Sequence, residues 1–571
     1  MRILNDLRFF RSLNGWSVRD LGGDLTAGLT LAAIAIPEQM ATASLGGFAP
    51  VIGFFAFIAG SIAFAAFAAS RYVSVGADST ITPIFAGGLT ALAITGTPAY
   101  FEYAATLALM VGAILVLAGV LRMGWIANLL SIPVTTGFLA GIAVHIVVSQ
   151  LPTLLGVPGG GNSLFSHIAV LAANIGHTNL FVLALGIGVF FVIIFVERVS
   201  SRIPGALIGL LIASVATIGF HLERRGVSVL GDISGALPHF AFPAFGIEDV
   251  AHLVALALLI SLVVMMQTAA TSNSFAATKE EPPDLNQDFI GAGAANLLSA
   301  LIGAIPVNAS PPRTAVVVQA GGRSQLSGLF AASLVATLVA FGPSLLIHVP
   351  RAALAGILLF VALRITRFSV MTKIYRQAIG EFGLIITTVI AIVVLPIQIG
   401  VAASVMLSIL HGVWMTTRTR VIEFERLPGT TIWWPASSPA AGEKVDGIMV
   451  LAFQAPLTFL NAHTFRRDFL AAILNSRRPL TAVILEASNI VEIDFTASQT
   501  LLQIIGDCSE NGISFDVARL ESVRGQQALE KFGVVKLLGR NRVFRSVEEA
   551  VNDLKGLNSR RQTSDVLGRV L

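Results

Sequence analysis

Two charged residues, Glu38 and Arg313, lie within predicted membrane spans, Glu38 in an apolar segment and Arg313 in a span that opens with polar residues. A charge at membrane depth costs at least about 2.5 kcal/mol, so each of them needs a function or a partner. Arg313 could supply the positive charge of an anion site, or it could snorkel or pair with an internal carboxylate. Glu38 could carry a proton, form a permanent ion pair with Arg313, or do neither.

Arg313 belongs to one of two segments that open with Gly, Pro and Ser in place of an apolar run. The first reads SVGADSTITPIF (74–85) and the second reads GAIPVNASPPRTAVVV (303–318). Pro favours the first turn of a helix, and Ser or Asn caps one. A helix N-terminus carries unpaired amide groups and about half a positive charge, so two that face each other form an anion site without a metal.

Asp78 and His145 have two interpretations each, and the single cysteine has one. Asp78 is expected to cap the first broken helix, with a role as substrate ligand as the alternative. His145 is expected to be neutral and bonded to a backbone carbonyl, with proton relay as the alternative. The single cysteine, Cys508, is interpreted as a helix-face thiol, and it excludes a disulfide framework or a cysteine metal site. No catalytic constellation, phosphate loop or metal-ligand spacing is present, so we expect no enzyme, cofactor or metal.

Transmembrane helices would hold these residues in place. The chain has 571 residues, 55% hydrophobic and only 12% charged, against about 25% charged in soluble proteins. A spanning helix needs about 20 mostly apolar residues. The predicted spans form two sets of seven, and the broken segments are the third span of each set. Because seven is odd, the second set must enter with opposite topology, and paired broken spans indicate a midplane site. The fourteen predicted spans lie near residues 25–45, 50–69, 78–95, 101–121, 126–150, 179–197, 203–220, 250–277, 289–304, 312–320, 326–346, 350–364, 379–396 and 399–416.

Basic residues predict the orientation of the chain in the membrane. Most of them fall on one side of this model, and residues 151–178 on the other side contain no Lys or Arg. Arg224 and Arg225, in the loop after the seventh span, do not fit this pattern. The majority places both termini in the cytoplasm and the chain in the cell inner (plasma) membrane. The positive residues behind the net charge of +4 are therefore interpreted as determinants of membrane topology. No nucleic-acid partner is expected.

The composition changes after residue 418. Segments 447–453, 481–487 and 513–518 resemble buried strands, and they alternate with helical patterns near 463–476, 496–510, 522–532 and 546–555. This alternation predicts an α/β domain with a largely parallel sheet. The expected organisation is an N-terminal segment (1–20), a membrane domain (21–418), a linker (419–439), the α/β domain (440–557) and a disordered tail (558–571).

Several motifs occur in the order found in the sulfate permease (SulP) family, which includes pendrin and prestin. DLTAGLTLAAIAIPEQMA (24–41) resembles its first span, and DFIGAGAANLLSALIGAIPVNASPPRTAVVVQAGGRSQLSG (288–328) is the strongest stretch. The resemblance implies two inverted seven-span repeats arranged as core and gate, a homodimer and an elevator-like mechanism. It also implies a substrate site between the helix ends of spans three and ten, near spans one and eight; the proton-coupling role assigned to Glu38 comes from its place as a carboxylate in an apolar span. The implied binding residues are Glu38, Gln39, Ser79, Thr80, Thr82, Gln267, Thr271, Ser310, Pro312, Arg313 and Thr314.

The C-terminal domain resembles a STAS domain, the fold of anti-sigma-factor antagonists. In NIVEIDFTASQTLLQII the strand-to-helix turn carries Asp494, and the antagonists place a phosphorylatable Ser directly after it. Here Phe495 stands in that place and Thr496 follows. We therefore expect dimer packing or contacts with a cytoplasmic protein partner, and no phosphoswitch.

Three residues depart from the family pattern in the membrane domain. Glu38 stands where many members have Gln, Gln267 where many have an acidic residue, and Pro312 where Ser is common. The first two departures suggest that coupling has moved from span eight to span one.

The leading hypothesis is therefore a secondary transporter of a small anion: sulfate, bicarbonate or a C4-dicarboxylate. It would work by proton symport or by exchange for a counter-anion. One alternative is an uncoupled channel or voltage-driven motor. The other is a nucleobase:cation symporter of a related fold, against which Gln267 and residues 440–557 argue.

Overall fold

The computed structural model describes residues 9–556 apart from 14, 130, 160–163, 201–202, 232–246, 277–282, 418, 437–441 and 477. The expected disordered tail and the first eight residues lie outside this described part. The chain divides into two compact units, Met1–Ser408 and Ile409–Leu571. The first is helical and the second contains a six-stranded sheet with helices, which confirms the predicted fold class.

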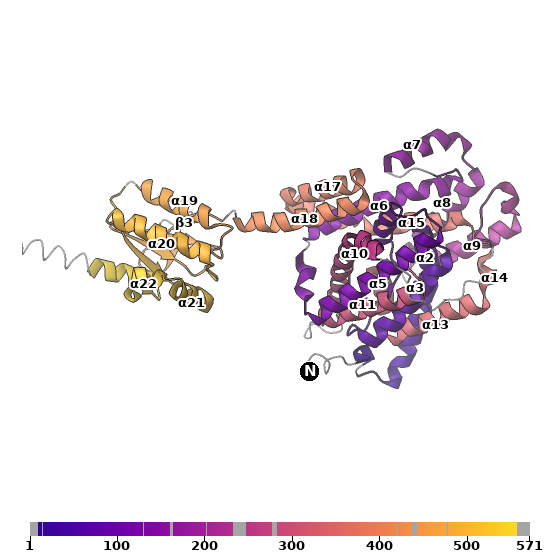
Figure 1. The fold of residues 1–571 in the computed structure, drawn as a ribbon, viewed down its shortest axis with the longest axis horizontal. Helices are drawn as coiled ribbons and strands as arrows, with labels where there is room; N and C mark the ends of the chain where they lie inside the picture. The colour runs from indigo at the N-terminus through magenta and orange to yellow at the C-terminus, as the bar shows by residue number, and fades with distance from the viewer. Residues whose placement is uncertain are drawn as a thin grey trace, which may run out of the picture. The chain divides into compact units, whose positions relative to one another are not determined.

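A helix coincides with each of the fourteen predicted spans (Figure 1). The short helices α7 and α16 lie between predicted spans, and α14 falls at the end of the span predicted over 326–346. Six helices of the described part are long and apolar enough to cross a membrane, and four more are apolar but shorter. The bounds are α2 Leu21–Leu45, α3 Pro50–Phe67, α4 Thr82–Leu89, α5 Pro98–Val120, α6 Ile132–Leu155, α7 Leu164–Asn174, α8 Leu180–Val199, α9 Gly205–Gly219, α10 Ile247–Ser274, α11 Leu285–Leu301, α12 Pro311–Gln319, α13 Leu326–Phe341, α14 Pro343–Leu346, α15 Arg351–Ile365, α16 Phe368–Gln377, α17 Ile379–Val394 and α18 Ile397–Thr417.

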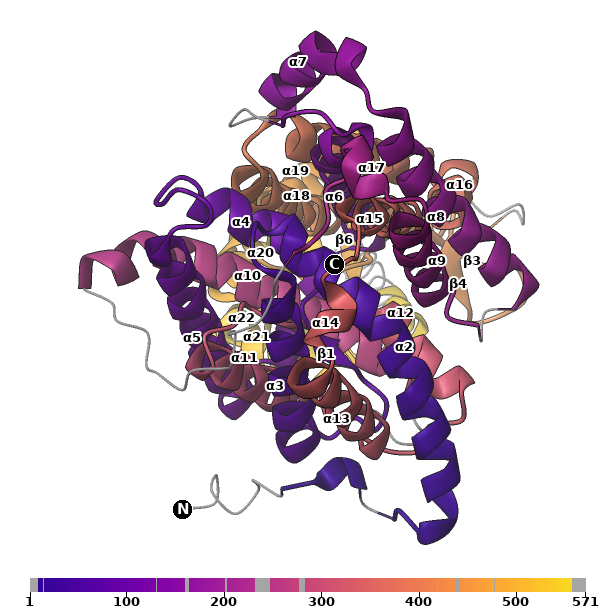
Figure 2. The same cartoon turned by 90° about the vertical axis from the view of Figure 1, so that its right-hand side faces the viewer.

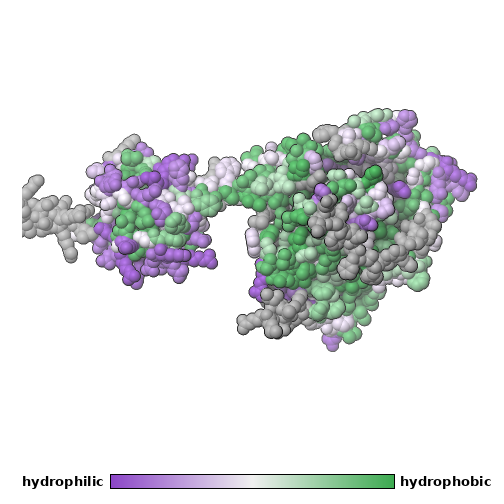
Figure 3. Space-filling view, viewed as in Figure 1, coloured by the Kyte–Doolittle hydropathy of each residue, from purple (hydrophilic) through white to green (hydrophobic). Residues whose placement is uncertain are grey.

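Large apolar side chains cover the outside of the helical unit. Phe341 is 85% exposed and Leu180 is 73% exposed, and green hydrophobic surface extends over much of the face seen in Figure 3. Apolar patches of this extent do not face water on a monomeric soluble protein. The surface is that of a protein embedded in lipid.

The two broken spans are the half-helices α4 and α12, and each follows a two-residue strand. Strand β1 (Val75–Gly76) pairs antiparallel with β2 (Asn308–Ala309), with Val75 opposite Ala309 and Gly76 opposite Asn308. Antiparallel pairing of equivalent segments is the arrangement that two repeats of opposite topology require. In Figure 2 the long α2 runs beside α12, and these two helices are in contact.

Close helix packing holds α3 against the middle of α2. A Cβ atom added at Gly53 would lie 2.1 Å from the carbonyl oxygen of Gln39, the residue next to Glu38. Overpacking of this kind costs about 1–3 kcal/mol. We expect Gly53→Ala to lower the thermal midpoint of the detergent-solubilised protein by several degrees. Gly188→Ala is the matched control, since a Cβ there meets nothing within 4 Å. Equal midpoints for the two variants would contradict this account of the packing.

The second unit contains a sheet of order β4-β3-β5-β6-β7-β8. Strands β5 to β8 pair in parallel, and β3 pairs antiparallel with both β4 and β5. The three predicted strands are β5, β6 and β7. The segment 419–439, expected to be a linker, contains β3 and β4, which extend the sheet at one edge. The bounds are β3 Val421–Arg426, β4 Trp433–Pro435, β5 Ile448–Phe453, α19 Ala462–Leu474, β6 Ala482–Glu486, α20 Phe495–Glu510, β7 Ser514–Ala518, α21 Val523–Lys531, α22 Val534–Leu538 and β8 Val543–Phe544.

Two apolar clusters lie on opposite faces of this sheet. On one face, side chains of α19, α20, α21 and α22 pack on Leu451, Val483 and Val517. On the other, a helix over 547–556 packs on Val450 and Ile484. At the start of α20, Asp494 accepts hydrogen bonds from the amides of Ala497 and Phe459, at 2.8 and 2.6 Å. Phe495 is 63% exposed beside it.

The single cysteine lies on the buried face of α20. Cys508 is 2% exposed, and burial, reinforced by Asp507, raises the pKa of its thiol to about 11. The reactive thiolate is therefore scarce at neutral pH. We expect the folded protein to react with a maleimide at pH 7.5 at least about tenfold more slowly than the denatured protein, measured by intact mass. Equal rates would place this thiol at the surface.

Candidate anion-binding site

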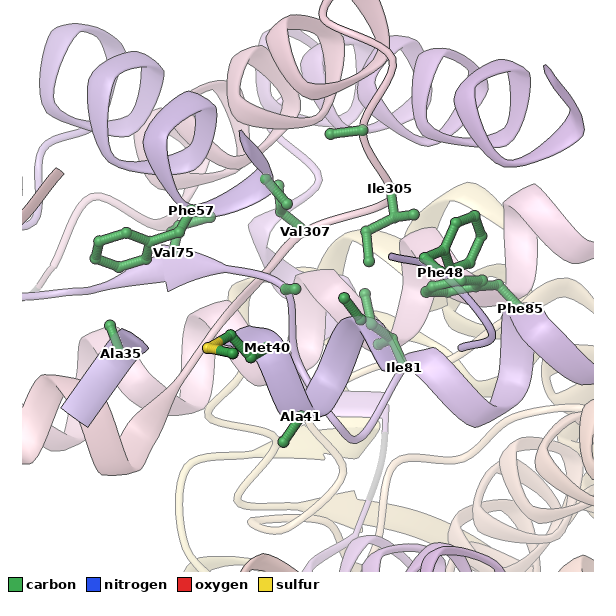
Figure 4. Packing of buried hydrophobic residues seen from close by; sticks show 14 of the residues in the cluster. Ala35, Met40, Ala41, Phe48, Phe57, Val75, Ile81, Phe85, Ile305 and Val307 are labelled. Atoms are coloured by element: carbon green, nitrogen blue, oxygen red, sulfur yellow. The ribbon is translucent and has the colours of Figure 1, made fainter. Parts of the chain in front are cut away.

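The N-termini of α4 and α12 are positioned by the β1–β2 pair, which lies in an apolar core. Figure 4 shows Val75 and Val307 of the strand segments among Phe57, Met40 and Ile81. The strands end just before the half-helices begin, so both helix ends lie beside the same short ladder. At α12 the first two positions are Pro311 and Pro312, which have no N–H group. The N-terminus of α12 therefore offers an anion few free amide donors. Its contribution to the site is the helix dipole and the charge of Arg313.

Arg313 is fully buried, with a side-chain exposure of 0%. Its Nη1 atom donates to Glu38 Oε1 at 3.2 Å and to the carbonyl oxygen of Ala77 at 3.0 Å. Its Nε and Nη2 atoms are buried and have no hydrogen-bond partner within the described residues. An unsatisfied buried donor costs about 1–3 kcal/mol, and more for a charged group. Two such donors on one guanidinium match the bidentate geometry of an oxyanion.

Glu38 is the partner of Arg313 and the more accessible member of the pair. Its side chain is 14% exposed. It follows Pro37 inside α2, where Pro removes the hydrogen bond to the carbonyl oxygen of Ala33. The ion pair between Arg313 and Glu38, one of the interpretations given for each residue, is therefore present. An anion and Glu38 would compete for the same guanidinium.

A polar cluster links α4 to α10. The hydroxyl oxygen of Thr80 lies 2.9 Å from Gln267 Oε1, and Asn308 Nδ2 donates to the same oxygen at 2.7 Å. Asp78 accepts from the amide of Thr80 at 2.9 Å and also from the Thr80 hydroxyl. Asp78 thus closes the turn that precedes α4, as its expected capping role implied, although the residue directly before the helix is Ile81.

Several predicted binding residues use their polar atoms to hold the backbone. Gln39 spans the peptide of Ala77, donating to its oxygen at 2.9 Å and accepting from its nitrogen at 2.8 Å. Thr314 accepts from the amide of Ser74 at 3.1 Å, and donates to the oxygen of Ser310. The hydroxyls of Thr82 and Thr271 donate to the carbonyl oxygens of Asp78 and Gln267. The polar atoms of these four side chains are therefore used to fix the backbone around the site and not to contact a ligand.

The other predicted residues stand at the helix ends. Ser79 and Ser310 are buried, and their hydroxyls make no hydrogen bond within the described part of the chain. Pro312 is half-buried at the second position of α12. The structure thus brings the eleven predicted residues to one region. It pairs Arg313 with Glu38, and it leaves Ser79 and Ser310 with free hydroxyls.

Sequence reasoning missed the amides and carboxylates that fix this region. Asn296 spans the peptide of Val307 much as Gln39 spans that of Ala77, with both distances 3.0 Å. Asp24 and Asp288 are fully buried and accept hydrogen bonds from loop amides and serine hydroxyls. Their signal was a polar residue in an apolar helix, the signal that identified Glu38. His145 binds the carbonyl oxygen of Ile392 at 2.7 Å, as expected for a neutral structural histidine.

Within the described residues, no three His, Cys, Asp or Glu side chains are grouped so that they could hold a metal ion. The charged groups of the site are one guanidinium and two carboxylates, set beside two helix N-termini. Together with the helical unit, this arrangement defines a polytopic membrane transporter joined to an α/β domain.

Comparison with known proteins identifies the family. Residues 21–413 match the sulfate permease family and residues 440–550 match the STAS domain. A probable sulfate transporter of Mycobacterium tuberculosis is 32% identical over 538 residues, covering 93% of this chain and 95% of its own length. The putative sulfate transporter YvdB of Bacillus subtilis is 26% identical, covering 94% and 98%. The chain belongs to the sulfate permease family, a family of anion transporters, and both predicted resemblances are confirmed.

Solved structures show the same fold. The murine anion transporter Slc26a9, in its inward-facing state, matches with a TM-score of 0.86 at 19% identity, covering 97% of this chain and 94% of its own. The transmembrane domain of the cyanobacterial bicarbonate transporter BicA matches with a TM-score of 0.60 at 20% identity, covering 69% and 97%.

Proposed function

We propose that this protein is a secondary active transporter that binds one small anion between the N-termini of α4 and α12. The observation that carries the proposal is the state of Arg313: it is fully buried, and two of its donor atoms lack a partner among the described residues. A buried charge with spare donors is costly unless a ligand completes it. The two helix N-termini favour a ligand of negative charge.

We further propose that Glu38 couples anion movement to protons. While Glu38 is ionised, it occupies Arg313 Nη1 at 3.2 Å and contributes a negative charge beside the site. A proton on Glu38 removes that charge and weakens its hold on the guanidinium. Anion and proton would then enter together, which is symport. Exchange for a counter-anion is the alternative that the same site permits.

Sulfate is the first substrate to test, because the curated relatives of the chain are named as sulfate transporters. Bicarbonate and C4-dicarboxylates such as fumarate remain in the proposal, since a guanidinium and helix dipoles select charge more than shape. The β1–β2 ladder ties α4 to α12, which supports an elevator-like motion of both half-helices as one body. A homodimer in the plasma membrane with cytoplasmic termini, and a protein partner for the STAS domain, complete the proposal.

The experiment is an uptake panel with the purified full-length protein in liposomes. Labelled sulfate, bicarbonate and fumarate are offered with and without an inward proton gradient, and with and without internal counter-anion. Accumulation of one anion that follows the proton gradient supports symport. Uptake that requires only internal anion indicates exchange. An anion current without either gradient would identify a channel and overturn the proposal.

A further inference from the structure

A second buried carboxylate lies in the candidate site and has no part in the cycle proposed above. Asp78 is 4% exposed. Its carboxylate accepts from the amide and the hydroxyl of Thr80 and from the side chain of Asn308. Asn308 also donates to Gln267 Oε1 on α10. The hydrogen bonds to Asp78 and the neighbouring Arg313 favour its carboxylate form, whereas burial opposes it.

The charged groups that face Asp78 are few. Arg313 on α12 attracts it, and Asp78 and Glu38 on α2 are close enough to repel each other. Arg364 on α15 acts on Glu38. From β2 and α10 the facing side chains, Asn308 and Gln267, are uncharged.

Helices α5 and α6 also pack against α4. The buried titratable groups on these two helices are bonded elsewhere. Tyr100 on α5 donates to the carbonyl oxygen of Gly46 at 2.8 Å, and His145 on α6 binds that of Ile392. Arg364 is itself paired with Glu197 at 3.6 Å, so the unbalanced charge of the site is the sum of Arg313, Asp78 and Glu38.

We infer that Asp78 makes the coupling obligatory. With Asp78 ionised, its charge cancels that of Arg313, and the site is negative while Glu38 is ionised and neutral once Glu38 is protonated. An anion is repelled in the first state and admitted in the second, because the helix dipoles and the spare Arg313 donors then act unopposed. Asp78 thus prevents transport of an anion without its proton. This inference rests on the proposed function. It assigns to a residue outside the Arg313–Glu38 pair the requirement that each anion be transported with a proton.

The test is Asp78→Asn in the full-length protein, with sulfate and fumarate as probes. Asn keeps an oxygen that can accept from the Thr80 amide, so the turn before α4 is retained while one negative charge is lost. At pH 8 the variant should bind the transported probe about tenfold more tightly than the wild type, as expected for the loss of one nearby like charge. The ratio of protons to anions taken up, measured with a pH dye and labelled probe, should fall below that of the wild type.

Asp288→Asn is the matched control, because Asp288 is also a buried carboxylate that accepts from backbone amides and serine hydroxyls. It should leave the ratio unchanged. Asp78→Ser is a second neutral variant, should the first be poorly folded. A gain in affinity cannot come from damage to the fold. An unchanged ratio in both Asp78 variants, with a proton-coupled wild type, would overturn this inference alone. A wild type that shows no proton coupling would overturn the proposed function as well.

Discussion

Replacing Arg313 with glutamine is expected to weaken anion binding by about 10- to 100-fold. Hydrogen bonds to a charged group contribute about 1.5–3 kcal/mol, and each 1.4 kcal/mol corresponds to a factor of ten. Arg313 is the fully buried guanidinium with two free donor atoms in the described structure. The measurement is the KM for uptake of the transported anion in proteoliposomes, together with the ligand-induced shift in the thermal midpoint in detergent.

The single substitution leaves Glu38 buried without its partner, which destabilises a protein by about 3–5 kcal/mol. The double variant Arg313→Gln with Glu38→Gln removes both charges of the 3.2 Å pair. It should keep the thermal midpoint of the wild type and still lose the anion-induced shift. Arg313→Lys keeps the charge but not the two free donors, and an intermediate affinity is expected. Wild-type affinity in the double variant would exclude Arg313 as the binding charge.

Glu38→Gln is expected to separate anion movement from the proton gradient. The amide cannot release a proton, so the site remains in the state that the protonated carboxyl has in the wild type. Anion uptake should continue down its own gradient, and the accumulation driven by an inward proton gradient should be lost. The measurement is the uptake of labelled anion at external pH 5 and pH 8 with internal pH 8. The wild type should be at least about tenfold faster at pH 5, and the variant should change less than about twofold.

Glu38→Asp is the conservative control for this prediction. It retains a titratable group on α2 and should retain part of the pH dependence, with a changed rate because the shorter side chain reaches Arg313 less well. If accumulation against a gradient survives in Glu38→Gln, another group carries the proton. Asp78 would then be the next residue to examine, as the remaining carboxylate beside Arg313.

The sequence was sufficient to locate the spans and the two charged residues, because the signals were local. Apolar runs marked the helices, and Glu38 and Arg313 were visible as charges within predicted spans, with their ion pair as one of several interpretations. Strands β1 and β2 were not visible, since two residues are too few to show an alternating pattern and their pairing joins distant segments. Strand β3 was missed for another reason: VIEFER carries three charged residues and resembles a solvated linker.

Individual roles within the site could not be read from residue type. Gln39 and Thr314 have the same chemistry as substrate ligands, but their partners are backbone groups of Ala77 and Ser74. Those partners lie on other segments and are defined only by the fold. Asp78 shows the converse. It was expected to cap α4, but the N-cap residue is Ile81, and only its position beside Arg313 and Glu38 indicates a role in the charge of the site.

The β1–β2 ladder also has a consequence for the synthesis of the protein. Strand β1 pairs with residues that follow it by more than 230 positions in the chain. At about 5–20 residues per second, the ribosome needs tens of seconds to supply that partner. During that interval the backbone groups of Val75 and Gly76 have no ladder, and unpaired backbone groups are not tolerated in lipid. The first half-helix must therefore stay sheltered by the insertion machinery or by neighbouring spans until the second is synthesised, and the proposed anion site is among the last parts of the nascent protein to form.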